Sequence, residues 1–164
     1  MIVILLLEPA ELASEVFYML SSDDTLTASV TDPASGCRVY FEDDGRVAYA
    51  YLVAADGQII ADVWLYNRGK APAEPEWHDN ETMPFANPAE FVRTDKPFNF
   101  AKRPSDITVL WEASEQYGLV ARIYIHNELF GILTPGAKPG WSVLATRDGP
   151  LAQKFTSSFG GSPD

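Results

Sequence analysis

The stretch that decides the fold is residues 38–67, which read RVYFEDDGRVAYAYLVAADGQIIADVWLYN. Two turn signals, Asp44-Gly45 and Asp56-Gly57, separate three runs rich in β-branched and aromatic residues, at 38–42, 47–54 and 58–67. Asp-Gly between two alternating runs indicates a tight hairpin, because glycine adopts the positive φ that such a turn requires. The stretch therefore predicts three consecutive antiparallel strands.

A second block repeats this rhythm at 107–111, 119–126 and 129–133, with a turn at Asn127-Glu128. Sustained helical periodicity is scarce, so the pattern predicts a mainly β protein, with α+β as the alternative. We expect two antiparallel meanders packed as a sandwich or a curled sheet, with one or two short helices.

The connection between the blocks, residues 69–106, contains six of the 12 prolines. Proline removes a backbone donor and disfavours regular structure. Asn87, Pro88 and Glu90 fit a capping box, which predicts a helical turn starting at Asn87. We expect the connection to pack on a single domain, 1–164, because several aromatic side chains would be costly to leave in water: Trp77, Phe85, Phe91, Phe98 and Phe100.

The two ends of the chain are less regular. Residues 10–20 fit a helix with one apolar side, while 16–20 alone also fit a strand. Gly149-Pro150 is typical of the start of a short helix through Phe155, and residues 156–164 are expected to fray. The apolar run 2–7 is too short to span a bilayer, so we expect a cytoplasmic protein that does not enter the membrane.

The composition argues against several classes of function, among them nucleic-acid binding and zinc binding. The chain has 164 residues, 46% of them hydrophobic, and a net charge of −11 from 12 bases and 23 acids. Such a charge repels nucleic acids and anionic membranes. Cys37 is the sole cysteine and His78 and His126 are the only histidines, so we expect neither a disulfide nor a zinc site, and no cofactor.

The negative charge is unevenly distributed. Residues 1–62 hold eleven acids and two bases, a net −9, whereas residues 63–164 carry only −2. A solvated face is the plain interpretation. The sharper one is a surface for a basic protein partner, since long-range attraction raises association rates roughly 10- to 1,000-fold at low salt.

One face of the first meander carries aromatic residues. A two-residue turn at Asp56-Gly57 pairs Tyr51 with Asp62, Tyr49 with Trp64 and Val47 with Tyr66. These aromatic side chains form either a second buried layer or a partly exposed binding platform. The binding residues we predict combine this face with the acidic turn: Glu42, Asp43, Asp44, Tyr49, Tyr51, Asp62, Trp64 and Tyr66.

Catalytic and metal-binding patterns are not evident. Glu42, Asp43 and Asp44 are consecutive, so along a strand they point to alternating faces, and Asp-Asp-Gly is ordinary turn chemistry. A carboxylate pair of Glu42 and Asp62 for glycoside hydrolysis is conceivable, but any acid-rich chain offers such pairs. No phosphate-binding, nucleophile-elbow or zinc-protease motif is present in the sequence. We therefore predict no catalytic residue and no metal site.

The segment VYFEDDG at 39–45, followed by Tyr49-x-Tyr51 and by Ala61-Asp62-Val63, resembles the signature of a bacterial family of small domains of unknown function. The family reads FEDDG, then Y-x-Y, then an L-D-A stretch, and it brings no activity with it. The resemblance implies a bacterial origin and that residues 42–45, Tyr49, Tyr51 and Asp62 belong to one structural unit.

Together these observations favour a non-enzymatic interaction module, such as an immunity or antitoxin-like protein, that binds a cationic partner through its acidic and aromatic residues. The alternative is a domain that binds or hydrolyses a small ligand in a pocket around Asp62. An exposed sheet edge would also allow a homodimer, so we expect either a monomer or a homodimer.

Overall fold

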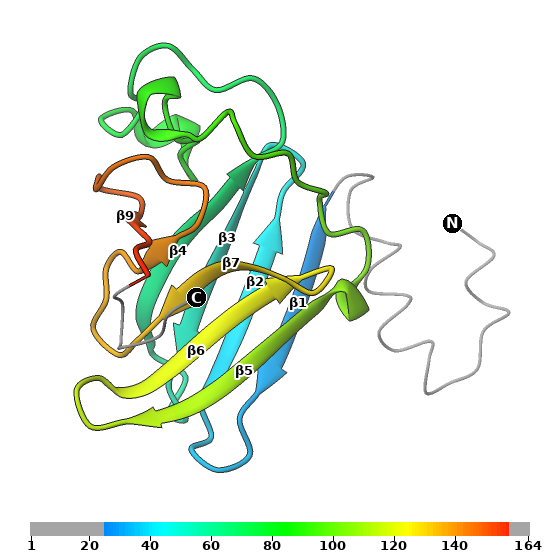
Figure 1. The fold of residues 1–164 in the computed structure, drawn as a ribbon, viewed down its shortest axis with the longest axis vertical. Helices are drawn as coiled ribbons and strands as arrows, with labels where there is room; N and C mark the ends of the chain where they lie inside the picture. Colours follow the sequence, from blue (N-terminus) through cyan, green and yellow to red (C-terminus); the bar gives the residue numbers. More distant parts are fainter. Residues whose placement is uncertain (1–24, 158–164) are drawn as a thin grey trace, which may run out of the picture.

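The computed structural model describes residues 25–157, which form two facing β-sheets (Figure 1). The first sheet is an antiparallel meander of four strands in sequential order, β1 (Leu26–Thr31), β2 (Arg38–Asp43), β3 (Val47–Val53) and β4 (Ile59–Asn67). The second sheet also follows chain order: β5 (Ile107–Ser114), β6 (Gly118–Ile125), β7 (Glu128–Leu133), β8 (Trp141–Ser142) and β9 (Gln153–Lys154).

The predicted fold class is confirmed, because two meanders pack face to face and each predicted strand is present within three residues of its expected bounds. Three strands were not predicted: β1, β8 and β9. The predicted helix at 149–155 is wrong, since Gln153–Lys154 instead pairs in parallel with Trp141–Ser142. The predicted helix or strand at 10–20 and most of the predicted frayed tail lie outside the described residues.

The register of β3 and β4 departs from the simple hairpin at two points. Next to the turn, Leu52 pairs with Ala61 but Val53 pairs with Ile59, which leaves Ile60 as an extra residue; the second departure lies farther along the strands. Tyr51 pairs with Asp62 and Tyr49 with Trp64, as predicted, but Tyr66 pairs with Ala48 rather than with Val47. The register shift leaves Leu65 as an extra residue, a β-bulge that reverses the side on which Tyr66 points. The Tyr66 ring therefore lies in the core, with its centroid 5.9 Å from that of Phe130 on β7.

The core fills the space between the two sheets. Alternate residues of each strand face inward, which is the period of two that a half-buried strand requires. The two sheets approach each other closely, because a Cβ added at Gly131 on β7 would lie 2.5 Å from Leu65 Cδ2 on β4. The fully buried members from both sheets include Phe41, Ala50, Leu52, Val63, Ile123 and Leu133.

Three short 3₁₀ helices interrupt the proline-rich connection: η2 (Asn80–Thr82), η3 (Ala89–Phe91) and η4 (Pro104–Asp106). The predicted capping box at Asn87 is wrong, because η3 starts after Pro88 and has no side-chain cap. Asn87 is buried instead, and its backbone N–H donates to the side-chain oxygen of Asn67. The connection packs on the core through aromatic side chains, among them Trp77, Phe85, Phe98 and Phe100.

Later segments of the chain cover the outer edge of β4. The Asp62 N–H donates to the Ala137 carbonyl at 3.1 Å, and the Gly140 N–H donates to the Asp62 carbonyl at 2.7 Å. Two residues on, the Trp64 N–H donates to the Leu151 carbonyl at 2.9 Å. These bonds hold the segment from Ala137 to Leu151 against β4, which removes an exposed edge from the first sheet.

Gly140 provides a test of this packing. A Cβ at position 140 would clash with the Ile132 carbonyl oxygen and lie 2.9 Å from Leu133 Cδ2. We expect Gly140→Ala to lower the free energy of unfolding by about 1–3 kcal/mol, as overpacking does. Gly69→Ala is the matched control, because nothing lies within 4 Å of its added Cβ. Urea denaturation measures both, and equal stability of the two variants would contradict the proposed crowding.

Candidate functional site

The outer face of the first sheet carries three tyrosines and two carboxylates in neighbouring rows. Tyr40, Tyr51 and Asp62 form one row across β2, β3 and β4, and Glu42 and Tyr49 form part of the next row. We call these five residues the tyrosine face. All but Tyr49 are partly exposed. The face therefore combines phenol rings and carboxylates at the surface of a rigid sheet.

The tyrosine rings lie close together. The Tyr40 and Tyr51 ring centroids are 6.2 Å apart with planes tilted by 33°, and those of Tyr49 and Tyr51 are also 6.2 Å apart but nearly parallel. The Tyr49 hydroxyl donates to the Phe85 carbonyl at 2.7 Å, which ties this ring to the connection. Tyr49 is thus buried beside Tyr51, whereas Tyr51 and Tyr40 are partly exposed.

Burial and charge shape the ionisation of this face. Partial burial raises the pKa of Glu42, and the nearby Asp44 carboxylate raises it further. Burial also raises the pKa of Asp62, which the Lys138 ammonium partly offsets. The pKa of Tyr51 rises to about 12. Burial is the largest cause, and the charges of Glu42 and Asp62 follow, with smaller effects of Tyr40 and Asp44.

The carboxylate pair considered for glycoside hydrolysis is not on adjacent strands. Glu42 and Asp62 lie on β2 and β4, with β3 between them, rather than on adjacent strands. Two strand spacings and an offset of one row place their Cα atoms about 12 Å apart. A hydrolytic pair is defined by the separation of its carboxyl groups, roughly 5–9.5 Å, which this Cα separation does not fix. The position of the two strands therefore gives no support to a catalytic pair.

The acidic turn separates its three carboxylates. Glu42 lies on the outer face, whereas Asp43 is fully buried and faces the core. Asp44 accepts hydrogen bonds from the backbone N–H groups of Arg46 and Val47, both at 2.9 Å. Within residues 25–157, no group of three or more Asp, Glu, His and Cys residues is arranged to hold a metal ion.

Asp43 is the centre of a buried polar cluster. The Tyr66 hydroxyl donates to Asp43 Oδ2 at 2.6 Å, and Arg68 Nη1 lies 3.2 Å from both carboxylate oxygens. The Ala101 N–H donates to the Tyr66 hydroxyl oxygen at 3.3 Å. Burial and the neighbouring carboxylate raise the pKa of Tyr66 well above its ordinary value. These groups join β2 and β4 to the connection.

Three of the eight predicted binding residues are therefore inaccessible to a partner. Asp43, Trp64 and Tyr66 are each 0% exposed. Trp64 shares a row with Glu42 and Tyr49, but its indole N–H donates to the Asn67 side chain in the interior at 2.9 Å. Sequence reasoning missed Tyr40, although its position on the strand before the acidic turn places it opposite Tyr51.

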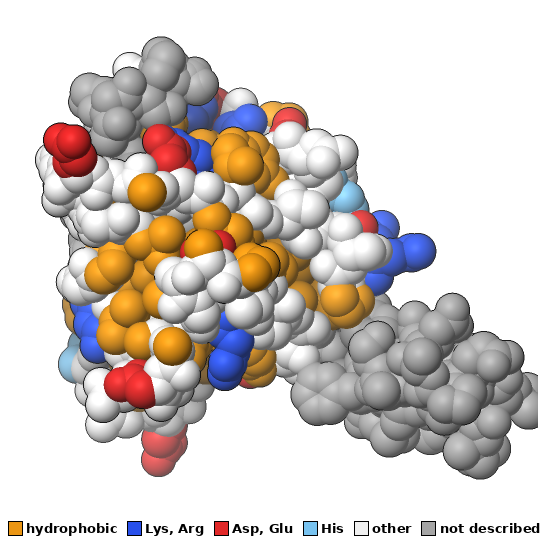
Figure 2. Space-filling model, turned by 90° about the horizontal axis from the view of Figure 1, so that it is seen from below, with side chains coloured by type: hydrophobic (Ala, Val, Ile, Leu, Met, Phe, Trp, Pro, Cys, Tyr) orange, Lys and Arg blue, Asp and Glu red, His pale blue; other side chains and the backbone are white. Residues whose placement is uncertain are grey.

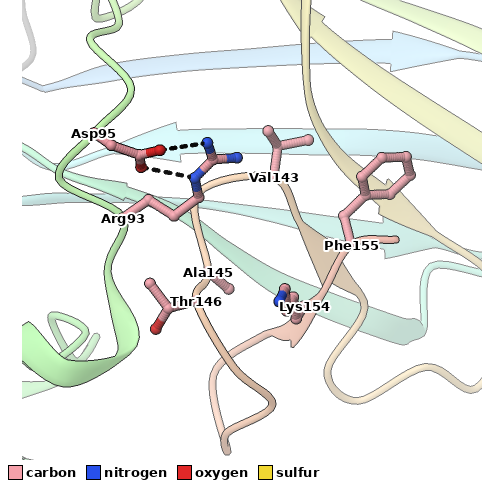
Figure 3. Close-up of a pocket in the computed structure, with 7 residues that line it drawn as sticks. All are labelled: Arg93, Asp95, Val143, Ala145, Thr146, Lys154 and Phe155. Atoms are coloured by element: carbon pink, nitrogen blue, oxygen red, sulfur yellow. Dashed lines mark hydrogen bonds and ion pairs between the residues drawn. The ribbon is translucent and has the colours of Figure 1, made fainter. Parts of the chain in front are cut away.

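Two cavities lie away from the tyrosine face. The larger one, about 450 Å³, is shown in Figure 3 and lies between the connection and the C-terminal segment. Arg93 lines it and donates two hydrogen bonds to the Asp95 carboxylate, at 3.0 and 3.1 Å, and Lys154 lines it from β9 (Figure 3). The smaller cavity, about 350 Å³, adjoins Arg93 as well. None of the eight predicted residues lines either cavity.

Hydrophobic side chains also reach the surface at one end of the sandwich. Figure 2 shows them gathered over the end that lies lowest in Figure 1, with charged side chains mostly toward the margins. Ile59, at the start of β4, is 52% exposed. Nothing among the described residues shows what would cover this end, so it carries no functional argument. No helix within residues 25–157 is long and apolar enough to cross a membrane.

Comparisons with known proteins do not assign the chain. No family model matches it, and no curated protein or solved structure is significantly similar to it. The resemblance to a bacterial family of small domains therefore stays a prediction. The functional argument depends on the geometry described above.

Tyr66→Phe tests the buried polar cluster. Loss of the hydroxyl removes the shorter of two hydrogen bonds to Asp43 Oδ2 and leaves the buried Ala101 N–H without its acceptor. We expect the free energy of unfolding to fall by about 1–3 kcal/mol, the cost of leaving buried polar groups unsatisfied. Tyr40→Phe, on the partly exposed face, is the control and should change stability by less than about 0.5 kcal/mol. Urea denaturation of both variants decides the matter, and an unaltered Tyr66→Phe protein would refute the role of the cluster.

The pKa values of three carboxyl groups should be shifted in opposite directions. In an NMR pH titration, we expect Glu42 and Asp62 to deprotonate above their ordinary pKa and Asp95, hydrogen-bonded to Arg93, below its own. Because the folded chain holds the Glu42 and Asp62 protons to higher pH than the unfolded chain, these two groups lower stability as pH rises above about 4. The Glu42→Gln variant should therefore lose less stability over this range. A Glu42 midpoint at or below its ordinary pKa would contradict the described burial.

Proposed function

We propose that this chain is a non-enzymatic interaction module whose tyrosine face binds a cationic segment of a partner protein, in the manner of an immunity or antitoxin-like protein. The observation that carries the proposal is the set of carboxylates around one ring. Asp62 pairs with Tyr51 across β3 and β4, and Glu42 lies in the next row on β2. Burial is the largest cause of the raised pKa of Tyr51, and these two carboxylates are the next largest. A cation bound over Tyr51 would sit in the field of these carboxylates.

Aromatic rings and carboxylates together favour guanidinium and ammonium groups. A cation over a tyrosine ring gains about 0.5–1 kcal/mol at an exposed site, and more where water is excluded. Arginine also stacks on ring faces and forms paired hydrogen bonds with carboxylates. Tyr40 and Tyr51 supply the rings, and Glu42 and Asp62 supply acceptors on either side. An arginine-rich segment is therefore the best match to this face.

The overall charge supports the same partner class. The net charge of −11 attracts a basic protein from a distance and speeds its encounter. The elevated pKa values of Glu42 and Asp62 mean that burial disfavours the ionised form of both groups, and the Asp44 carboxylate adds to this effect for Glu42. A bound cation would relieve this cost, so binding should strengthen as these groups ionise.

A defined peptide tests the site. We expect an arginine-rich peptide to bind the wild-type chain, and the double variant Glu42→Gln, Asp62→Asn to bind it about tenfold more weakly by isothermal titration calorimetry. The matched control is Glu115→Gln, Glu128→Gln, which removes the same charge from exposed residues near the hairpin turns of the second sheet. Its affinity should fall less than about threefold, through long-range attraction alone. Equal losses in the two double variants would refute a site on the tyrosine face.

Affinity capture from the source cell tests whether a protein partner exists. The wild-type chain should retain a basic protein at low salt that high salt releases, and the Glu42→Gln, Asp62→Asn variant should lose it while the control variant keeps it. A partner that both double variants retain equally, or one indifferent to salt, would argue against this function.

A further inference from the structure

The smaller cavity has a lining unlike the rest of this acidic protein. It opens where β4 ends, beside residues 93–100 of the connection, and has a volume of about 350 Å³. Its lining includes three cationic side chains, Arg68, Arg93 and Lys96, and no carboxylate. Phe98 and Phe100 form an aromatic part of the wall. Three cations with two phenylalanine rings in a chain of net charge −11 require an explanation.

Arg68 is held in place from two sides. Its Nη1 atom lies 3.2 Å from both oxygens of the buried Asp43, and its guanidinium carbon lies 4.5 Å from the centre of the Phe100 ring. Arginine carries five N–H donors. Among the described residues, only the Nη1 group of Arg68 has a hydrogen-bond acceptor, and the side chain is 25% exposed. Arg68 therefore keeps donors for a ligand without having to reorient.

Two further cations adjoin Arg68. Arg93 pairs with the exposed Asp95, an interaction that solvent weakens and that a ligand could replace. Within the described part of the chain, Lys96 forms no ion pair, although its charge contributes to the low pKa of Asp95. The free ammonium of Lys96 and the fixed guanidinium of Arg68 line the same cavity.

The aromatic wall is also rigid. The Phe98 and Phe100 ring centroids lie 5.2 and 5.4 Å from that of the fully buried Tyr66. Binding sites for small molecules typically combine such apolar walls with a few fixed polar groups. We propose that this cavity binds a small organic anion in which a carboxylate or phosphate group is attached to an aromatic ring. The anionic group pairs with Arg68, Arg93 and Lys96, and the ring packs on Phe98 and Phe100.

Phenyl phosphate is the probe, with inorganic phosphate, phenol and benzoate as comparison ligands. In ¹H–¹⁵N NMR titrations we expect phenyl phosphate and benzoate to shift the amide signals of Gly69, Thr94 and Lys96 in a saturable way. Inorganic phosphate and phenol should bind at least about fivefold more weakly, because each lacks one half of the recognised chemistry. Phosphate alone binding as tightly as phenyl phosphate would overturn the aromatic part of the proposal, and absence of saturable shifts with either aryl anion would overturn all of it.

Variants locate the site. Lys96→Ala and Arg93→Ala should each weaken phenyl phosphate binding about tenfold. Lys70→Ala removes an equal charge close by but outside the lining and should weaken it less than about twofold. Arg68 is left intact, because it also stabilises Asp43. Equal losses in Lys70→Ala and Lys96→Ala would show general charge attraction and would overturn the proposed site. The Glu42→Gln, Asp62→Asn variant should bind phenyl phosphate no more weakly than the wild-type chain, so this site and the tyrosine face are tested separately.

Discussion

The burial of the Asp43 carboxylate is the constraint on which much of the described structure depends. A buried carboxylate is unfavourable unless hydrogen bonds and an opposite charge replace the water it has lost. Here Tyr66 donates its hydroxyl, Arg68 supplies the charge and the Gly45 N–H donates at 2.9 Å. These partners come from the β2–β3 turn, from β4 and from the residue that follows it. The register of three strands must therefore be correct for this carboxylate to be satisfied.

The bulge at Leu65 is what makes this arrangement possible. In a regular hairpin Tyr66 would pair with Val47 and point to the outer face with Tyr49 and Tyr51. The extra residue moves Tyr66 to the inner side, opposite Ala48, in the same row as Asp43. Its ring then contacts Phe98 and Phe100, which attaches the proline-rich connection to the core. One inserted residue thus converts an aromatic surface position into the junction of the two sheets and the connection.

The alternation of residues and the Asp-Gly turns were sufficient to predict the hairpins, because both signals are local. The pairs Tyr51 with Asp62 and Tyr49 with Trp64 were predicted from a two-residue turn and are observed, although Val53 pairs with Ile59 and the extra residue Ile60 restores the register. The bulge could not be predicted, because its stability depends on contacts of Tyr66 with residues more than thirty positions away. Strands β8 and β9 are two residues long and are defined by pairing rather than by pattern, so the Gly149-Pro150 helix signal was misleading.

The candidate sites show the same division between local and long-range information. Consecutive acids on a strand must point to alternate faces, and so the separation of Glu42 from Asp43 was implicit in their adjacency. Which of the two is buried depends on whether a residue distant in sequence supplies an opposite charge. Arg68 supplies that charge to Asp43 through an ion pair. The same contact holds Arg68 beside Phe100 at the smaller cavity. Asp43 consequently holds a cationic side chain at the cavity beside the end of β4. Its neighbour on β2, Glu42, points to the opposite side of the sheet and belongs to the acidic outer face.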